Sequence, residues 1–373
     1  MATNKNSLDF DQLDTYFREN NFPAIEENKK GMLFLKLKSI SRKATLMEFC
    51  THYKITTKGL STKNVLKYLF DSKQIHEGQL NNFIHQKYQA ERREREKHQD
   101  YLVDQLSRLH HFDWGGSYGN SLEKNIVNNY VKKIKSYDDI NQEIEGSLLS
   151  SLRGYTLNSW YNHWTSILIE DIFKDHQDVL PAIGLIKKID FFIHNIPFDL
   201  KVTYFPEQLL AEKLKNSGYG NELTKLKQVC RKLHIFIPSD LKDKTLRQHL
   251  YNKVSEDPRN DAKEFIKILD IQKQKIITEA KNNPAELKKW FYENQGETRF
   301  DASNRFFLVL TDETNLAESW KLKRNINFLK TRIHQHLTTL SPDMSDLTTE
   351  FYWHKDQKYY HCKSDILFLK YEG

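Results

Sequence analysis

The stretch KKIDFFIHNIPFDLKVTYF, from Lys187 to Phe205, places Asp190, Asp199 and Lys201 inside a mainly apolar run. Its pattern predicts a hairpin, with one strand over 184–193, a turn at His194-Asn195 and a return strand over 196–205. Alternation along the return strand puts Asp199 and Lys201 on one face, and a tight turn brings Asp190 beside Asp199. Because charged groups are costly to bury without partners, we expect these three residues to form a functional site.

The apolar residues on both sides of these charges predict a strand that helices cover on both faces. Outward from the hairpin, apolar spacing predicts a helix over 159–176, with Trp160 and Trp164 on its buried side. The remaining predicted elements are helices at 207–217, 221–234, 261–292 (interrupted near Asn283-Pro284) and 320–337, a short buried strand at 305–312, and a terminal hairpin at 350–370. The sequence therefore predicts a helix-rich α/β fold with a central mixed sheet flanked by helices.

The N-terminal part of the chain has a different pattern. Residues 1–85 predict a helical region, in which Ser61 or Thr62 caps a helix. A helix, a short link and a second helix there resemble a SAP-like DNA-binding hairpin, although an ordinary helical hairpin fits the same pattern. The charged residues of 86–119 predict a helical connector, and 120–373 a second domain with a helical insertion at about 235–300.

Composition limits the classes of function. The 373 residues carry 57 lysines and arginines against 50 acidic residues, a net charge of +7 that permits a polyanionic partner. The three cysteines are far apart, and the polar N-terminus lacks a leader-like apolar segment, so we expect a cytoplasmic protein with reduced thiols. No apolar run reaches the roughly 20 residues of a membrane span. Phosphate-binding glycine loops, the GxSxG elbow and zinc-ligand spacings are also absent from the sequence.

The hairpin residues suit one kind of chemistry. Two neighbouring carboxylates repel each other unless a cation lies between them, and their oxygens are ligands for Mg²⁺, with Mn²⁺ as a substitute. A lysine beside them can orient water and stabilise charge on a phosphate, which is the requirement of phosphodiester hydrolysis. The alternative is structural: Asp199 and Lys201 form a solvent-facing pair, and Asp190 pairs with Lys187 or Lys188.

Asp190, followed after a hairpin by Asp199-Leu200-Lys201, resembles the D…(D/E)xK signature of the PD-(D/E)xK nuclease superfamily, whose fold type II restriction endonucleases share. The resemblance implies that Asp190 and Asp199 bind the metal and that Lys201 activates water. It also implies a metal-binding glutamate on the preceding helix, which is Glu170; Glu145 and Asp171 compete for this role. Ile189 stands where the family signature has proline.

The resemblance implies a Mg²⁺-dependent endonuclease that cuts double-stranded DNA at specific sequences, acts as a homodimer and is accompanied by a cognate methyltransferase in antiviral restriction-modification. One alternative is a non-specific or RNA-directed defence or toxin nuclease. Others are a catalytically silent DNA-binding protein on the same fold and a structural protein. The sequence leaves open the recognition site, the cleavage stagger and the base-contacting residues.

Overall fold

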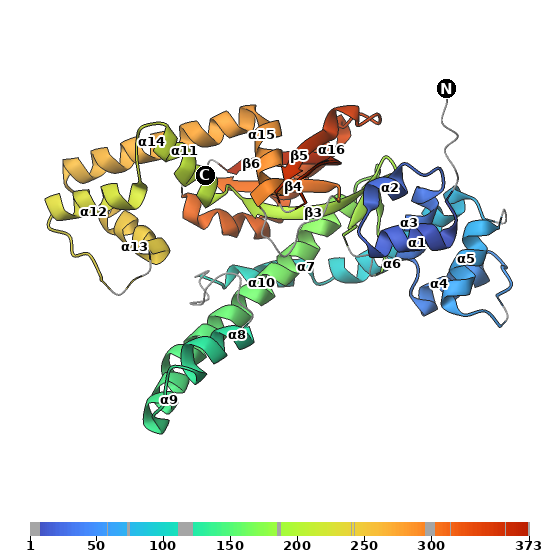
Figure 1. Ribbon diagram of the computed structural model, residues 1–373, viewed down its shortest axis with the longest axis horizontal. Coiled ribbons are helices and arrows are strands. Elements are labelled where there is room, and N and C mark those ends of the chain that lie inside the picture. Colours follow the sequence, from blue (N-terminus) through green and yellow to red (C-terminus); the bar gives the residue numbers. More distant parts are fainter. Residues whose placement is uncertain are drawn as a thin grey trace.

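The computed structural model describes residues 8–57, 59–72, 75–110, 122–184, 188–239, 241, 243–294, 303–313, 315–354 and 356–371. Within these ranges the chain forms sixteen α-helices and a six-stranded mixed sheet (Figure 1). The predicted helix-rich α/β class is therefore confirmed. No helix in the described ranges combines the length and the apolar character that crossing a membrane requires.

The sheet has the strand order β1-β2-β3-β4-β6-β5. Its strands are β1 (Val179–Pro181), β2 (Phe191–Ile193), β3 (Ile196–Tyr204), β4 (Arg305–Asp312), β5 (Thr348–Trp353) and β6 (Lys358–Tyr371). The first three strands form an antiparallel meander, and β4 then pairs in parallel with β3. The predicted C-terminal hairpin is present as β5 and β6, and β6 also pairs in parallel with β4 in the middle of the sheet.

The predicted central hairpin is right at its turn and wrong at its first strand. His194 and Asn195 have φ values of 46° and 65°, the left-handed conformation that a two-residue hairpin turn requires. Only Phe191–Ile193 of the predicted first strand is extended, because Gly184 and Lys188 also take positive φ values, 97° and 69°, which break a strand. Residues 185–187 lie outside the described ranges.

The helices before the sheet are α1 (Phe10–Arg18), α2 (Phe22–Glu26), α3 (Gly31–Ser39), α4 (Lys43–His52), α5 (Thr62–Asp71), α6 (Glu77–Glu96), α7 (Gln99–Ser107), α8 (Leu122–Ile126), α9 (Tyr137–Glu143) and α10 (Leu149–Lys174). Two π-helical turns, η1 (Val127–Val131) and η2 (Ile144–Leu148), extend α8 and join α9 to α10. Ser61 caps α5 as predicted, by accepting a hydrogen bond from the backbone of Asn64. The predicted boundary between residues 85 and 86 falls inside α6.

The helices after β3 are α11 (Glu207–Asn216), α12 (Glu222–Lys232), α13 (Asp243–Ser255), α14 (Asn260–Asn282), α15 (Pro284–Asn294) and α16 (Ile326–Thr339), with 3-10 turns η3 (Leu316–Arg324) and η4 (Ser345–Leu347). The helix predicted over 320–337 is thus divided at Asn325, where a 3-10 segment meets α16. The predicted interruption at Asn283-Pro284 is confirmed as the junction of α14 and α15.

Helices cover both faces of the sheet. On one face, α10 and α16 bury Phe198, Leu200 and Phe306 with their own apolar residues. On the other face, α14 and α15 pack on Phe307 and Val309, and Phe291 stacks on Phe307 with ring centroids 4.8 Å apart. The hairpin strand is therefore enclosed as its sequence predicts, which limits solvent access to its charged residues.

The N-terminal helices are joined to the sheet through a shared core. Phe192 of β2 and Leu180 of β1 are buried in the same apolar cluster as α1 to α6. The buried Lys36 of α3 donates to the side chain of Asn195 in the hairpin turn, at 2.8 Å. These contacts fix the helical region against the strands that carry the charged residues.

Candidate active site

Asp199 and Lys201 lie where the strand pattern places them. The ammonium group of Lys201 donates to Asp199 Oδ1 at 2.7 Å, and Arg305 Nε lies 3.8 Å from Asp199 Oδ2. Asp199 is opposite Arg305 in the parallel pairing of β3 with β4, which explains this second contact. The buried carboxylate thus lies between two cations, one on its own strand and one on the neighbouring strand.

Asp190 lies in a bend just before β2 and is held next to β3. Its Oδ2 accepts a hydrogen bond from the backbone N–H of Leu200 at 2.7 Å, and its own N–H donates to the carbonyl of Phe198 at 2.8 Å. Burial, together with the negative charges of Glu170 and Asp199, raises the pKa of Asp190 to about 7. The three predicted carboxylates therefore share one electrostatic neighbourhood.

The structure separates the three acidic candidates on the preceding helical segment. Glu170 of α10 is the one whose charge acts on Asp190, and its Oε2 accepts from Lys174 at 2.9 Å. Asp171 instead accepts two hydrogen bonds from Arg95 of α6, at 2.7 and 2.8 Å. Glu145 is exposed in η2, on the part of the helical segment that leads away from the sheet (Figure 1). Of the three, Glu170 is thus the one whose charge acts on Asp190.

The donor chemistry of this neighbourhood suits a hard divalent cation. The available atoms are carboxylate oxygens of Asp190, Asp199 and Glu170, and their mutual repulsion is the condition that a bound cation relieves. As they stand, no three His, Cys, Asp or Glu side chains in the described ranges are arranged to hold an ion. Occupation requires Asp199 to exchange part of its contact with Lys201 for the metal, a side-chain rotation at the exposed end of that pair.

Two residues next to the site were missed from sequence. Asn304 precedes β4, and its side-chain amide donates to both carboxylate oxygens of Glu26, at 2.8 and 2.9 Å, and to the carbonyl of Pro197 at 3.1 Å. Its backbone carbonyl accepts from the N–H of Asp199 at 3.0 Å. Arg305 follows directly. The sequence offers one signal for Asn304 and Arg305, a polar pair where the apolar run 305–312 begins. The residues that they contact lie on distant segments of the chain, so the sequence does not reveal them.

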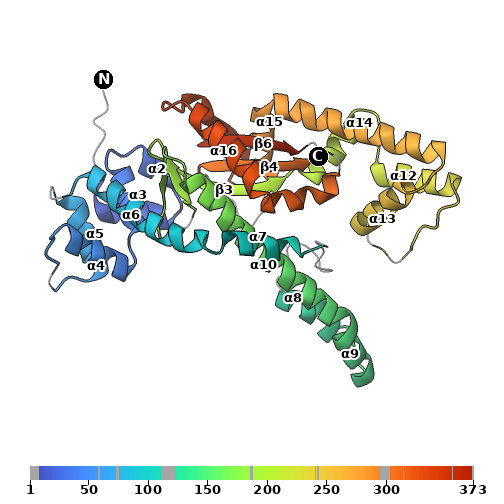
Figure 2. The ribbon, with the colours of Figure 1, turned by 180° about the vertical axis from the view of Figure 1, so that it is seen from behind.

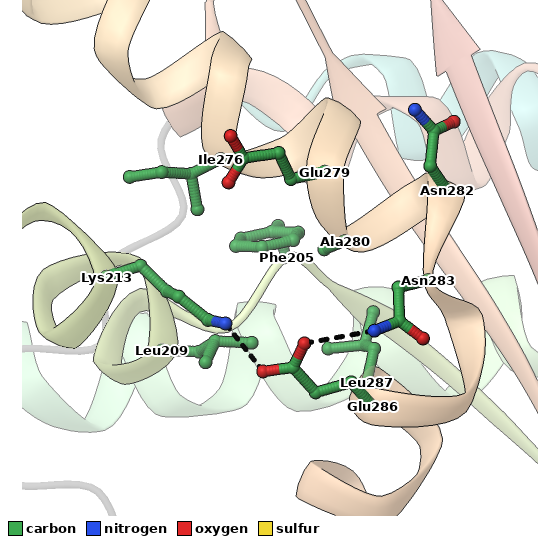
Figure 3. A pocket seen from close by; sticks show the side chains of 10 residues that line it. All are labelled: Phe205, Leu209, Lys213, Ile276, Glu279, Ala280, Asn282, Asn283, Glu286 and Leu287. Carbon is green, nitrogen blue, oxygen red and sulfur yellow. Dashed lines mark hydrogen bonds and ion pairs between the residues drawn. The ribbon is translucent and has the colours of Figure 1, made fainter. Parts of the chain in front are cut away.

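A pocket among the described residues lies away from these carboxylates. It has a volume of about 330 Å³ and lies between α11, α14 and α15, near Phe205 beyond the far end of β3 (Figure 3). An ion pair between Lys213 and Glu286, at 2.5 Å, closes one side of it. None of the predicted site residues lines this pocket, so it is separate from the carboxylate site.

Comparison with known proteins gives no relative for this chain. No family model matches it, and neither a curated protein nor a solved structure is significantly similar.

Proposed function

We propose that the protein is a Mg²⁺-dependent endonuclease that hydrolyses phosphodiester bonds of DNA, similar to type II restriction enzymes. The observation that carries the proposal is the contact of Lys201 with Asp199 at 2.7 Å, beside Asp190, whose pKa the charges of Glu170 and Asp199 help to raise. The element order supports it: helix α10, the meander β1 to β3, helix α11 and parallel strand β4 follow the order of the PD-(D/E)xK core.

Each residue has a role in this chemistry. Asp190, Asp199 and Glu170 would hold Mg²⁺, which stabilises the charge that develops on the phosphate. Lys201 has a partly exposed side chain, so its ammonium group reaches the solvent side of the strand while it contacts Asp199. From there it orients the attacking water and stabilises the phosphate oxygens. The water oxygen forms the new bond to phosphorus and its proton passes to solvent, while the bond to the leaving sugar oxygen breaks and that oxygen takes a proton from solvent.

A basic segment after the hairpin offers a surface for the polyanion. Residues 213–253 contain ten lysines and arginines against three acidic residues. Some of them pair with carboxylates, among them Arg247 with Glu207 at 2.8 Å, whereas Lys215 and Arg231 are exposed to solvent. Residues of this segment pack around a small core of their own, shared by α12, α13 and the start of α14. An excess of positive charge on one helical unit attracts nucleic acid.

The test is to incubate supercoiled plasmid with the purified protein in Mg²⁺ or in EDTA. We expect cleavage in Mg²⁺ only, reduced roughly 100-fold or more by Lys201→Ala. Lys370→Ala is the matched control, because it removes a lysine from another lysine–carboxylate pair, with Glu313, outside the basic segment. Discrete bands would locate a recognition sequence, and a smear would assign non-specific cleavage. Intact DNA with cleaved RNA, or equal activity in EDTA, would overturn the proposal.

A further inference from the structure

A helical arm projects from the body of the protein. It consists of residues 122–157: α8 and η1 run outward, and α9, η2 and the first turns of α10 return to the sheet (Figure 1, Figure 2). The two halves touch through the hydroxyls of Tyr130 and Ser147, 3.2 Å apart. An isolated pair of short helices gains little stability in water without an apolar contact between them.

Much of the apolar surface of this arm faces solvent. Its apolar residues Ile126, Val127, Ile134, Ile140 and Leu148 are only half-buried, and the fully buried side chains among its described residues are Asn125 and Ser151. Its exposed side chains include seven of the fifteen large exposed hydrophobic residues found in the described ranges, namely Val131, Tyr137, Ile144, Leu149, Leu152, Tyr155 and Leu157. Tyr137 is 79% exposed and Val131 61%. Such a concentration of apolar surface marks an interaction site.

The charges of the arm favour a protein partner over a polyanion. Lysines 132, 133 and 135 form the tip, and the next turns carry Asp138, Asp139, Glu143 and Glu145. A surface with both signs in similar number gives no net attraction to nucleic acid. Two arms that overlap at their tips in an antiparallel contact would set the lysines of each against the acidic turns of the other, so the tip is complementary to itself.

We infer that two copies of this chain associate through arm 122–157, in an antiparallel contact related by a two-fold axis. The inference rests on the polarity and charge of the arm and is independent of the proposed nuclease activity. If that activity is present, the contact brings two active sites into one particle, as cutting both strands requires.

Sedimentation of the full-length chain tests the contact. We expect a dimer for the wild type and a monomer for Val131→Glu/Tyr137→Glu, with the circular dichroism spectrum retained. Ile268→Glu/Ile271→Glu is the matched control, because these residues are also exposed and hydrophobic, but lie on α14. This control should remain dimeric. A monomeric wild type, or a dimer that survives the arm variant, would overturn the inference.

Charge reversal identifies the partner as a second copy. Reversal of the tip (Lys132→Glu/Lys133→Glu/Lys135→Glu) and reversal of the acidic turns (Asp138→Lys/Asp139→Lys/Glu143→Lys/Glu145→Lys) should each weaken self-association at least tenfold. Mixing the two variants should restore a heterodimer, since both contacts then pair opposite charges. Absence of the heterodimer would contradict the antiparallel arrangement. Binding of the arm to anionic lipid vesicles, with no self-association, would assign the surface to membranes instead.

Discussion

The carboxylate of Asp190 and the backbone N–H of Leu200 are joined by a hydrogen bond of 2.7 Å, which holds Asp190 beside the residue that follows Asp199. The bond favours the ionised form of Asp190, yet burial and the charges of Glu170 and Asp199 raise its pKa to about 7. The hydrogen bond therefore holds the carboxyl group of Asp190 near Asp199, although burial and the nearby negative charges disfavour its ionised form.

The raised pKa predicts a stability that falls as pH rises. Between about pH 4 and 7 the unfolded chain has released the proton of Asp190 while the folded chain keeps it, so the free energy of unfolding decreases through this window and levels off above it. In EDTA at pH 8 we expect Asp190→Asn to be more stable than the wild type by roughly 2–4 kcal/mol, and equal to it near pH 4. Urea unfolding across this range measures the difference.

Other groups also titrate in this window, and Glu26, whose pKa burial raises to about 7, is one of them. The informative quantity is therefore the difference between the two proteins, since Glu26 is common to both. Mg²⁺ should raise the unfolding midpoint of the wild type more at pH 8 than at pH 5, because the cation favours the ionised carboxylates. If the free energies of unfolding of the wild type and Asp190→Asn changed with pH in the same way, the ionisation of Asp190 would not affect stability, and the prediction would be wrong.

Replacement of the adjacent α10 residues Asp171 and Glu170 should have different effects, one mainly on stability and the other mainly on Mg²⁺ binding. Asp171 is buried and accepts two hydrogen bonds from Arg95, so Asp171→Ala should lower the free energy of unfolding by roughly 1–3 kcal/mol. Glu170 is partly exposed, so Glu170→Ala should cost less than about 1 kcal/mol while weakening Mg²⁺ binding roughly 10–100-fold. Urea unfolding and the Mg²⁺ dependence of cleavage separate the two effects. A reversed result would move the metal site to Asp171.

Local patterns predicted the elements that carry the site. The turn at His194-Asn195 and the strand over 305–312 follow from residue type and apolar runs, which depend on short-range physics. Strand β1 escaped notice because three residues give no periodicity. Helix α13 lies in the helical insertion predicted at about 235–300, and its buried Leu246, Leu250 and Val254 recur at four-residue spacing.

Long-range contacts set the limit of prediction from sequence. The choice between Glu145 and Glu170 depends on where each lies along one continuous helical segment, and only Glu170 lies near the strands. The insertion of β6 beside β4 depends on pairing between segments far apart in the chain. The contact of Glu26 with Asn304 spans 278 residues, so no local pattern contains it.

The contact between Glu26 and Asn304 should contribute measurably to stability. Asn304 is buried and Glu26 is half-buried, and loss of either side chain would leave polar atoms of the other unsatisfied, so a double-mutant cycle with Glu26→Ala and Asn304→Ala should give a coupling of about 1–3 kcal/mol. The exposed pair Glu48 and Lys87, at 2.7 Å, is the control, with a coupling of less than about 1 kcal/mol. Equal couplings would mean that burial adds nothing to the first pair.

The basic segment 213–253 should determine how DNA affinity depends on salt. Each lysine or arginine that contacts a phosphate contributes about 0.9 to the slope of log affinity against log salt concentration, because a condensed counterion is released. Lys215→Ala/Arg231→Ala should therefore weaken binding of a DNA duplex in Ca²⁺ at low salt and lower this slope by up to about 2. Fluorescence anisotropy titrations at several salt concentrations measure both quantities.

The matched comparison is Arg42→Ala/Lys43→Ala, which removes two exposed basic residues at the start of α4 in the N-terminal helical region. If the segment 213–253 binds the phosphates, this pair should leave the slope unchanged. If the N-terminal helices bind DNA, as the resemblance of their hairpin to a SAP-like unit implies, the slope should change with Arg42 and Lys43 and not with Lys215 and Arg231. Because each pair removes two positive charges, the change in net charge cancels between the variants, and only the location of the phosphate contacts separates them.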